Sequence, residues 1–381
     1  MSWIPRGHVI NSHLICPAKR VKLGVPTRQA RMDTLIFGIK RWLMLLAGGL
    51  LLTACGSDAD KNQAPSYRSV EGATMGTYYR VQYRESEKCA TSQQGLDELL
   101  QGFNQSLSTY VADSEISAFN RADEEGWQTL SPRFSSVLQA ALLVWRESEG
   151  AFDVTIGPLV NLWGFGPLEV VELPSLEAQR SAARWVGMEQ LQLDAPNSAA
   201  RKKAKGVYVD LSALAKGLGV DELAEHMAAK SCTDFMVDIG GEMRTVGSSP
   251  GGRPWRIGIE KPVAGSLGSI HRVLSVTGQG VATSGDYRNF REVGGIRVDH
   301  VIDPRTGRPA ENQVASVTVI HPQAMYADAY ATTIMVLGGD AGLALAERLS
   351  LAVLVIEKGA DGAFVERYTP AMTAYLVAPP S

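Results

Sequence analysis

Asp328 and Thr332 are the residues whose types and spacing first suggest metal chemistry in this 381-residue chain. Residues 325–338 have a helical pattern, so side chains four positions apart lie on one face. A carboxylate and a hydroxyl are hard oxygen ligands that suit Mg²⁺, which usually keeps several waters and takes phosphate oxygens from a substrate. The alternative is a hydrogen bond between the two side chains at the start of the helix, without a metal.

The segment DLSALAKG at 210–217 has the features of an anion site. A predicted strand, 206–210, ends there and a predicted helix, 212–230, begins, and the free amides at a helix start attract anions. Lys216 lies about one turn inside that helix, where a cation opposes the helix dipole unless an anion such as a phosphate is nearby. A capping Asp210 followed by a solvated lysine is the purely structural interpretation.

Aromatic residues and glycines suggest a place for a planar ring. The segment GAFDVTIGPLVNLWGFG at 150–166 holds three aromatic residues, four glycines and a single carboxylate, Asp153, and suits recognition of a purine or isoalloxazine edge. Tyr110 could stack on such a ring. Gly76, within a predicted strand at 73–84, indicates close approach of a ligand or another backbone. An aromatic-filled loop, a packed surface tyrosine and a β-bulge are the alternatives.

His300 lies where a predicted strand, 297–302, gives way to the turn-rich sequence DPRTG at 303–307. A strand end that lines a ligand is a suitable place to aim an imidazole at bound substrate. The alternative is a hydrogen bond that stabilises the turn, made to Asp303 or to a neighbouring carbonyl.

The elements that must position these residues follow no regular βαβ order, which predicts an α+β fold of mixed or antiparallel sheets with packed helices. Asp238–Glu242 is expected to form a tight bend between strands. Without a repeat or a break in composition within 69–381, we expect one two-lobed catalytic unit. The predicted helices are 93–107, 132–149, 174–186, 212–230, 325–338 and 340–349, and the predicted strands are 73–84, 189–193, 206–210, 234–247, 255–260, 270–277, 297–302, 315–320, 351–357 and 371–377.

Charge separates the N-terminal region from the rest of the chain. Residues 1–54 hold eight of the 37 basic residues and one of the 40 acidic ones, so residues 55–381 carry a formal charge of −10. The formal net charge of the whole chain, −3, argues against nucleic acid as the main partner.

Residues 32–54 have the features of a lipoprotein signal peptide. Lys40 and Arg41 precede an apolar run, 42–54, which is too short to span a bilayer core of about 30 Å as a helix. The run ends in LTAC, which resembles the bacterial lipobox, so Cys55 is the predicted lipid-bearing first residue of the mature chain. An uncleaved signal anchor and a buried apolar segment are the alternatives. Met32 offers a conventional start, so we interpret residues 1–31 as an upstream extension and residues 55–68 as a polar tether.

Cys89 and Cys232 are the two cysteines that follow the predicted lipidation site. Their separation has no metal-ligand spacing. An extracytoplasmic location would permit a disulfide between them, and two unpaired cysteines fit the sequence at least as well.

Eight motifs, taken together and in order, resemble the ApbE family of FAD:protein FMN transferases. They are TMGT at 74–77, SEISAFN at 114–120, GAFDVTIGPLVNLWGFG at 150–166, DLSALAKG at 210–217, DIGGE at 238–242, TSGDY at 283–287, HVIDPRTG at 300–307 and MYADAYATT at 325–333. The resemblance implies Mg²⁺-dependent transfer of FMN from FAD to a Ser or Thr hydroxyl of a target protein, with release of AMP. If water replaced the hydroxyl, the same site would be an FAD pyrophosphatase. A non-catalytic FAD-binding carrier is a further alternative.

The same resemblance assigns roles to individual residues. His300 is the implied base for the acceptor hydroxyl. Asp328 and Thr332 are implied Mg²⁺ ligands by their side chains, and Ala213 and Ala331 by their backbone carbonyls. The implied FAD contacts are Met75, Tyr110, Ala151, Phe152, Asp153, Asp210, Lys216 and Ile302.

The resemblance also implies partners and a location. The family's acceptors are subunits of Na⁺-pumping NADH:quinone reductase and of Rnf-type complexes. We therefore expect a periplasmic protein held by its lipid anchor at the periplasmic face of the inner membrane. Gly56 after the predicted lipidated cysteine, where an Asp would signal inner-membrane retention, leaves the outer membrane open.

Overall fold

The structure is a computed structural model of the chain. It describes residues 66–377 apart from 123–125, 168–169, 171, 264–267, 288–289 and 294. The predicted extension, signal peptide and Cys55 lie outside the described residues, as does most of the predicted tether. Strand β1 begins at Tyr67, so the last two residues assigned to the tether belong to the fold. Ala59–Ser381 forms one compact unit.

An eight-stranded sheet, antiparallel throughout, forms the centre of this unit, in the order β1-β2-β6-β7-β10-β15-β16-β17. The predicted α+β class is confirmed. The sheet's strands are β1 (Tyr67–Thr74), β2 (Thr77–Arg84), β6 (Phe235–Ile239), β7 (Glu242–Val246), β10 (Gly280–Gly285), β15 (Val314–His321), β16 (Ala352–Lys358) and β17 (Phe364–Tyr368).

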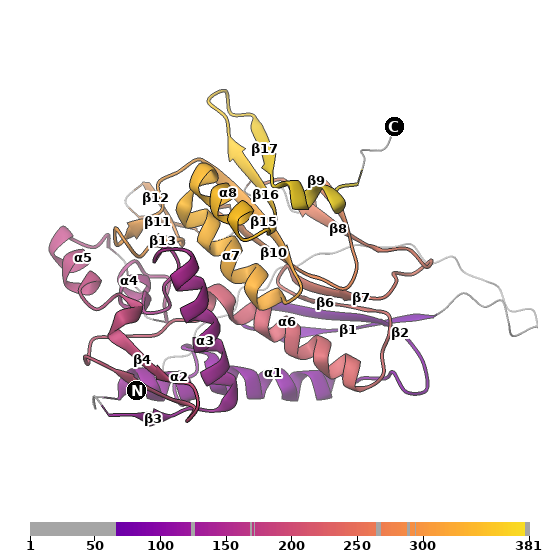
Figure 1. Ribbon diagram of the computed structural model, residues 1–381, viewed down its shortest axis with the longest axis horizontal. Helices are drawn as coiled ribbons and strands as arrows, with labels where there is room; N and C mark the ends of the chain where they lie inside the picture. Colours follow the sequence, from indigo (N-terminus) through magenta and orange to yellow (C-terminus); the bar gives the residue numbers. More distant parts are fainter. Residues whose placement is uncertain are drawn as a thin grey trace, which may run out of the picture. The chain divides into compact units, whose positions relative to one another are not determined.

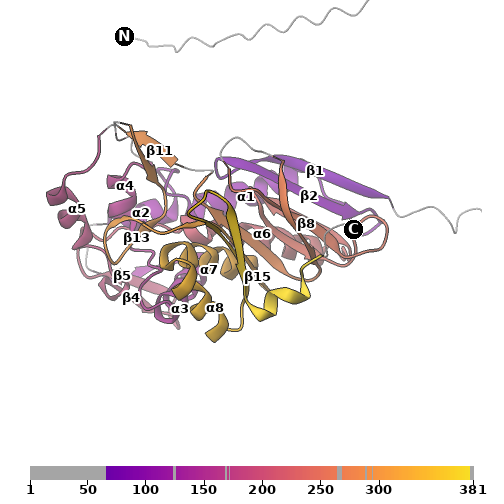
Figure 2. The same ribbon diagram turned by 90° about the horizontal axis from the view of Figure 1, so that it is seen from above.

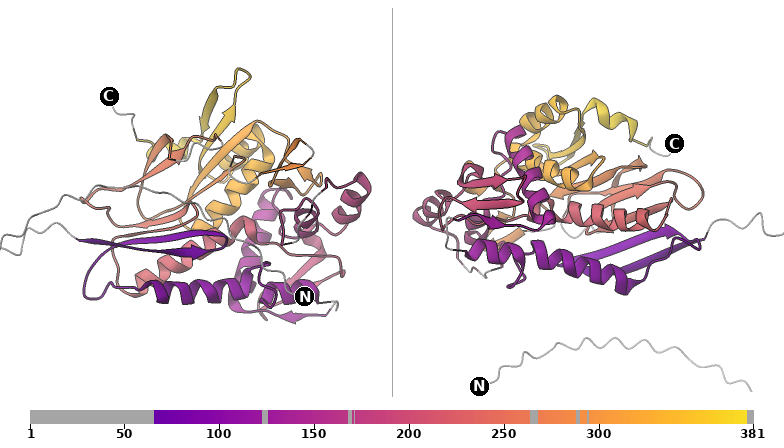
Figure 3. Two further views of the ribbon diagram at one scale, coloured as in Figure 1. Left: turned by 180° about the vertical axis from the view of Figure 1, so that it is seen from behind. Right: turned by 60° about the horizontal axis from the view of Figure 1, so that its bottom comes forward.

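Helices cover one face of the sheet, and α6 and α7 lie side by side across it (Figure 1). Helix α1 runs beside the β1–β2 hairpin, which Figure 3 shows from below. The helices are α1 (Gln93–Leu107), α2 (Glu115–Arg121), α3 (Pro132–Glu147), α4 (Gly157–Leu162), α5 (Leu176–Ala183), α6 (Ser212–Ala229), α7 (Ala324–Leu337) and α8 (Gly339–Arg348).

Successive side chains of strand β16 point to opposite faces of the sheet, and both faces are buried here. Val353 and Val355 belong to the core cluster that includes α3 and α7. Ala352, Leu354 and Ile356 belong to a cluster on the opposite face, with the hairpin of β8 (Trp255–Glu260) and β9 (Ile270–Val276). The sequence of a strand that is buried on both faces is therefore a continuous apolar run.

Three smaller sheets complete the unit. They are β3 (Gln128–Thr129) with β5 (Ala199–Lys202) and β4 (Leu191–Asp194), β11 (Phe290–Val293) with β12 (Ile296–Asp299), and β13 (Ile302–Asp303) with β14 (Arg308–Pro309). The β11–β12 hairpin lies near α4 (Figure 2), where Arg291 donates to the carbonyl of Trp163 at 3.0 Å.

Several predicted elements were wrong. The strand predicted at 73–84 is confirmed only from Thr77, where β2 begins. Met75 (φ 49°) and Gly76 (φ 72°) close a two-residue turn of the left-handed kind that hairpins favour, and the residues before it end β1. Residues 206–210 form no strand beyond a bridge at Tyr208. In place of the strand predicted at 371–377 lies a 3₁₀ helix, Pro370–Ala374, with Pro at its start. The predicted bend at 238–242 is confirmed between β6 and β7.

A disulfide joins Cys89 to Cys232, which resolves the alternatives that the sequence left open. It ties the segment before α1 to the segment after α6. Among the described residues, no helix is both long and apolar enough to cross a membrane.

Candidate active site

The first turns of α6 and α7 meet at Asp328, which is 2% exposed. Its Oδ2 accepts a hydrogen bond from the amide of Gly217 at 3.0 Å. A Cβ on Gly217 would lie 2.3 Å from the carbonyl oxygen of Ala324, so only glycine permits this approach of the two helices. The predicted metal residue and the predicted anion site are therefore neighbours.

Lys216 stands between two buried carboxylates. Its Nζ lies 3.2 Å from Oε1 of Glu242 and 3.8 Å from Oδ1 of Asp328. Burial raises the pKa of both carboxyl groups above their ordinary values, and the lysine charge opposes that rise. The cation that was predicted for a phosphate is thus held, in this structure, by two acids that would otherwise repel each other.

Asp328 and Thr332 offer the kind of oxygen atoms that Mg²⁺ prefers. Thr332 lies one turn further along α7, and its Oγ1 is 3.4 Å from Oγ of Ser284. In a regular helix the amide of Gly217 would donate to the carbonyl of Ala213. Because this amide donates to Asp328, the Ala213 carbonyl shares or loses its usual donor. No group of three or more His, Cys, Asp or Glu residues suited to a metal occurs among the described residues. A set with few charged ligands suits Mg²⁺, which keeps waters and binds substrate phosphates.

Asp221, which the sequence analysis missed, fixes the start of α7. Its Oδ1 and Oδ2 accept from the amides of Ala324 and Met325, each at 3.0 Å. Arg244 donates to the same carboxylate at 2.6 Å. Helix α7 has no side-chain cap of its own. The local signal that could have found Asp221 is a carboxylate inside a mostly apolar helix.

Asp210 lies at the start of α6, as predicted. Its Oδ1 accepts from the amide of Ser212 at 2.8 Å, and its own amide donates to the carbonyl of Val154 at 2.7 Å. Burial, and next the negative charge of Asp210, raise the pKa of Tyr110. The Tyr110 hydroxyl donates to the carbonyl of Phe165 at 2.9 Å, while 65% of the residue is exposed. The aromatic segment, Tyr110 and the α6 start therefore belong to one site.

Asp153 is buried together with Ala151 and Phe152. Its Oδ1 accepts from the amide of Thr155 at 2.7 Å and its Oδ2 from that of Met188 at 2.9 Å. Burial outweighs these bonds and raises the pKa of Asp153 to about 6. Within the protein the carboxylate thus braces the 151–156 loop; its contact with FAD stays a prediction.

Met75 and Ile302 occupy different surroundings. Met75 sits in the β1–β2 turn and reaches α6, where a Cβ on Gly219 would lie 2.8 Å from its Cε. Ile302 is 5% exposed on β13. Ala331 is fully buried within α7.

His300 follows β12. Its Nδ1 lies 3.0 Å from Oδ1 of Asp299, and its ring meets Phe165 edge-on at 6.2 Å. Asp303, the alternative partner considered for His300, accepts from the backbone amide and the guanidinium of Arg305. A carboxylate at Nδ1 favours the tautomer that leaves Nε2 free to accept a proton. Phe165 therefore joins His300 to the Tyr110 side of the site.

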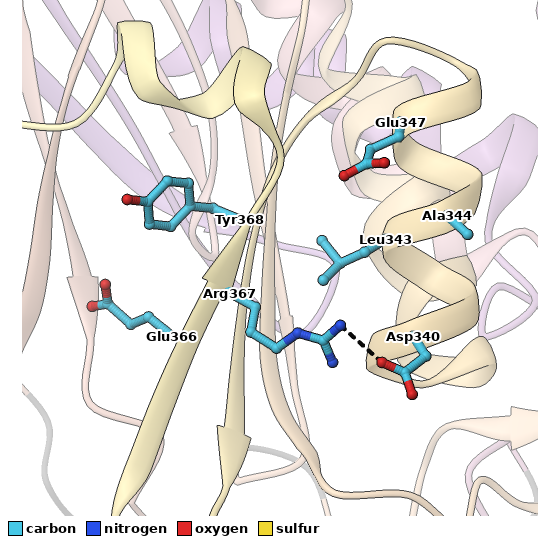
Figure 4. A pocket seen from close by; sticks show the side chains of 7 residues that line it. All are labelled: Asp340, Leu343, Ala344, Glu347, Glu366, Arg367 and Tyr368. Atoms are coloured by element: carbon cyan, nitrogen blue, oxygen red, sulfur yellow. Dashed lines mark ion pairs between the residues drawn. The ribbon is translucent and has the colours of Figure 1, made fainter.

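Two surface hollows are lined by other residues. One, of about 610 Å³, is lined by α8 and β17, where Arg367 pairs with Asp340 at 2.8 Å (Figure 4). The other, of about 480 Å³, lies beside Trp127, Trp145 and Met188. Neither lining includes a predicted site residue.

Known proteins resemble this chain along most of its length. It is 40% identical over 328 residues to the FAD:protein FMN transferase of Vibrio cholerae, covering 85% of this chain and 96% of that protein. It is 40% identical over 350 residues to the protein of the same name from Haemophilus influenzae, covering 89% and 97%.

Solved structures agree with the sequence relatives. The flavin transferase ApbE of Vibrio cholerae superimposes with a TM-score of 0.76 at 39% identity, covering 82% of this chain and all of that one. The apo flavinyl transferase ApbE of Pseudomonas stutzeri gives a TM-score of 0.74 at 33% identity, covering 83% and 98%. The ApbE family profile matches residues 75–355, and this chain belongs to the ApbE family.

Proposed function

We propose that this protein is an FAD:protein FMN transferase that moves FMN from FAD to a Ser or Thr hydroxyl of a target protein, with Mg²⁺, and releases AMP. Family membership supports the enzyme class. The observation that carries the chemistry is the meeting of Asp328 with Lys216 and Gly217 near the start of α6. A cation and a hard oxygen ligand close to the start of a helix suit a diphosphate.

The proposed reaction is a phosphoryl-group displacement. The acceptor oxygen forms a bond to the phosphorus that carries riboflavin, the bridging P–O bond of the diphosphate breaks, and AMP leaves with that electron pair. Such reactions depend on positioning and charge neutralisation more than on covalent help from the protein. Lys216 would neutralise charge on the diphosphate. His300 would take the acceptor's proton at Nε2, since its Nδ1 lies against Asp299.

Asp328, Thr332 and the carbonyls of Ala213 and Ala331 are the residues that would hold Mg²⁺. When bound, the ion supplies Lewis-acid stabilisation of phosphoryl oxygens. The aromatic side of the site, with exposed Tyr110 joined to Phe165, would receive a flat ring of FAD.

The test is incubation of the full chain with FAD, MgCl₂ and a co-expressed acceptor subunit of a Na⁺-pumping NADH:quinone reductase or an Rnf-type complex. Mass spectrometry should show FMN added to the acceptor and AMP in solution. AMP without modified acceptor would identify an FAD pyrophosphatase. FAD bound without AMP would identify a non-catalytic carrier.

We further propose that the protein acts in the periplasm, anchored through lipid at Cys55. The apolar run at 42–54 ending in LTAC supports this. The disulfide between Cys89 and Cys232 supports it independently, because disulfides persist in oxidising compartments.

A further inference from the structure

Glu242 is a buried carboxylate that the predicted site residues do not include. It begins β7, directly after the Gly240–Gly241 bend, and is 4% exposed. Its Oε1 faces Lys216 at 3.2 Å, and its buried Oε2 has no hydrogen-bond partner among the described residues. Burying a carboxylate against a single ammonium is costly for stability, so the arrangement calls for a role in the site.

The inference about Glu242 rests on the proposed function, in which Lys216 needs a carboxylate partner other than Asp328. Metal at Asp328 would compete for the carboxylate that now lies 3.8 Å from the Lys216 ammonium. The lysine side chain is 32% exposed, at the edge of solvent. A lysine stem is flexible and its ammonium is strongly hydrated. Without Glu242 the ammonium would lose the nearer of these two carboxylates.

We propose that Glu242 is a positioning residue, which holds the ammonium of Lys216 at the start of α6 so that it faces the FAD diphosphate while Asp328 serves the metal. Glu242 itself touches neither substrate nor metal in this arrangement. Its whole effect on FAD binding therefore runs through Lys216. That dependence separates it from a direct ligand, whose effect would survive removal of the lysine.

A double-mutant cycle on FAD affinity tests the proposal. Flavin fluorescence is measured with the full chain and MgCl₂, without acceptor protein. Glu242→Gln keeps the side chain's size and removes its charge, and Lys216→Met keeps the apolar stem. We expect Glu242→Gln to weaken FAD binding about tenfold in the wild-type chain and less than about twofold in the Lys216→Met chain. Glu242→Asp, which keeps the charge, should recover part of the affinity.

Glu222→Gln is the matched control. Glu222 lies on the same helix as Lys216, but its carboxylate pairs with Arg133 at 2.7 Å on α3. Its removal should leave FAD affinity unchanged. Circular dichroism is used to check that each variant folds. If Glu242→Gln does not fold, Glu242→Asp takes its place in the cycle.

Equal losses of FAD affinity in the two backgrounds would overturn the inference, as would no loss in the wild-type chain. Calorimetric titration with MgCl₂ alone then identifies the alternative: a loss of Mg²⁺ affinity that persists in the Lys216→Met chain makes Glu242 a direct metal ligand. Failure of the proposed function looks different. A wild-type chain that binds FAD but leaves the acceptor unmodified refutes FMN transfer and leaves the cycle intact, whereas one that binds no FAD refutes both.

Discussion

Replacing Asp221 tests how the fold places the site. The carboxylate accepts from the amides of Ala324 and Met325 and pairs with Arg244. Asp328 lies about one turn further along the same helix. The cap is thus expected to set the position of the proposed metal ligand as well as the stability of α7.

The contacts of Asp221 determine how much stability the substitution Asp221→Ala should remove. Asp221→Ala leaves two buried amides without an acceptor, at about 1–3 kcal/mol each. The Arg244 side chain is 25% exposed and can turn partly to water, so its lost pair adds less than a fully buried pair would. We expect a loss of about 3–5 kcal/mol from the free energy of unfolding, against a usual total of about 5–15 kcal/mol. Asp221→Asn keeps one acceptor oxygen and should lose less.

Urea unfolding of the full chain, followed by tryptophan fluorescence, measures this loss. Asp340→Ala is the matched control, because Asp340 opens α8 but is 94% exposed in its pair with Arg367. Its loss should stay below about 1 kcal/mol. If Asp221→Ala unfolds as the control does, the cap contributes nothing measurable and the reasoning is refuted.

The remaining predictions concern chemistry, pH and location. His300→Asn should lower FMN transfer by ~10²–10⁴-fold with FAD affinity intact; poor FAD binding with normal transfer per bound FAD would assign His300 to structure. Asp328→Asn keeps an acceptor for Gly217 and should abolish Mg²⁺-dependent turnover, whereas normal turnover at limiting MgCl₂ would place the metal elsewhere. Burial raises the pKa of Asp153 from 3.8 to about 6. The thermal stability of the wild-type chain relative to Asp153→Asn should therefore fall as pH rises through that interval and level off above it. A difference in stability that does not depend on pH would contradict this. Cys55→Ser should release the chain from the membrane fraction, and unchanged partitioning would rule out the lipid anchor.

Local sequence was sufficient for elements that carry their own start and stop signals. The helix predicted at 93–107 matches α1, which Ser92 caps, and the helix predicted to begin at 132 does so, with Ser131 as the cap of α3. The strand predicted at 255–260 matches β8. At Met75–Gly76 periodicity alone did not detect the turn, so the predicted strand ran through it and most of β1 was missed.

The motifs by themselves determined the family and the proposed chemistry, because residue types and their order survive without coordinates. Only the tertiary structure decided which residues meet. It placed Glu242 beside Lys216, gave α7 its cap from Asp221, and joined Cys89 to Cys232. These partners are far apart in the chain, and α6 and α7 approach closely because Gly217 has no Cβ at their contact. Such a contact depends on how whole elements pack, which no local pattern records.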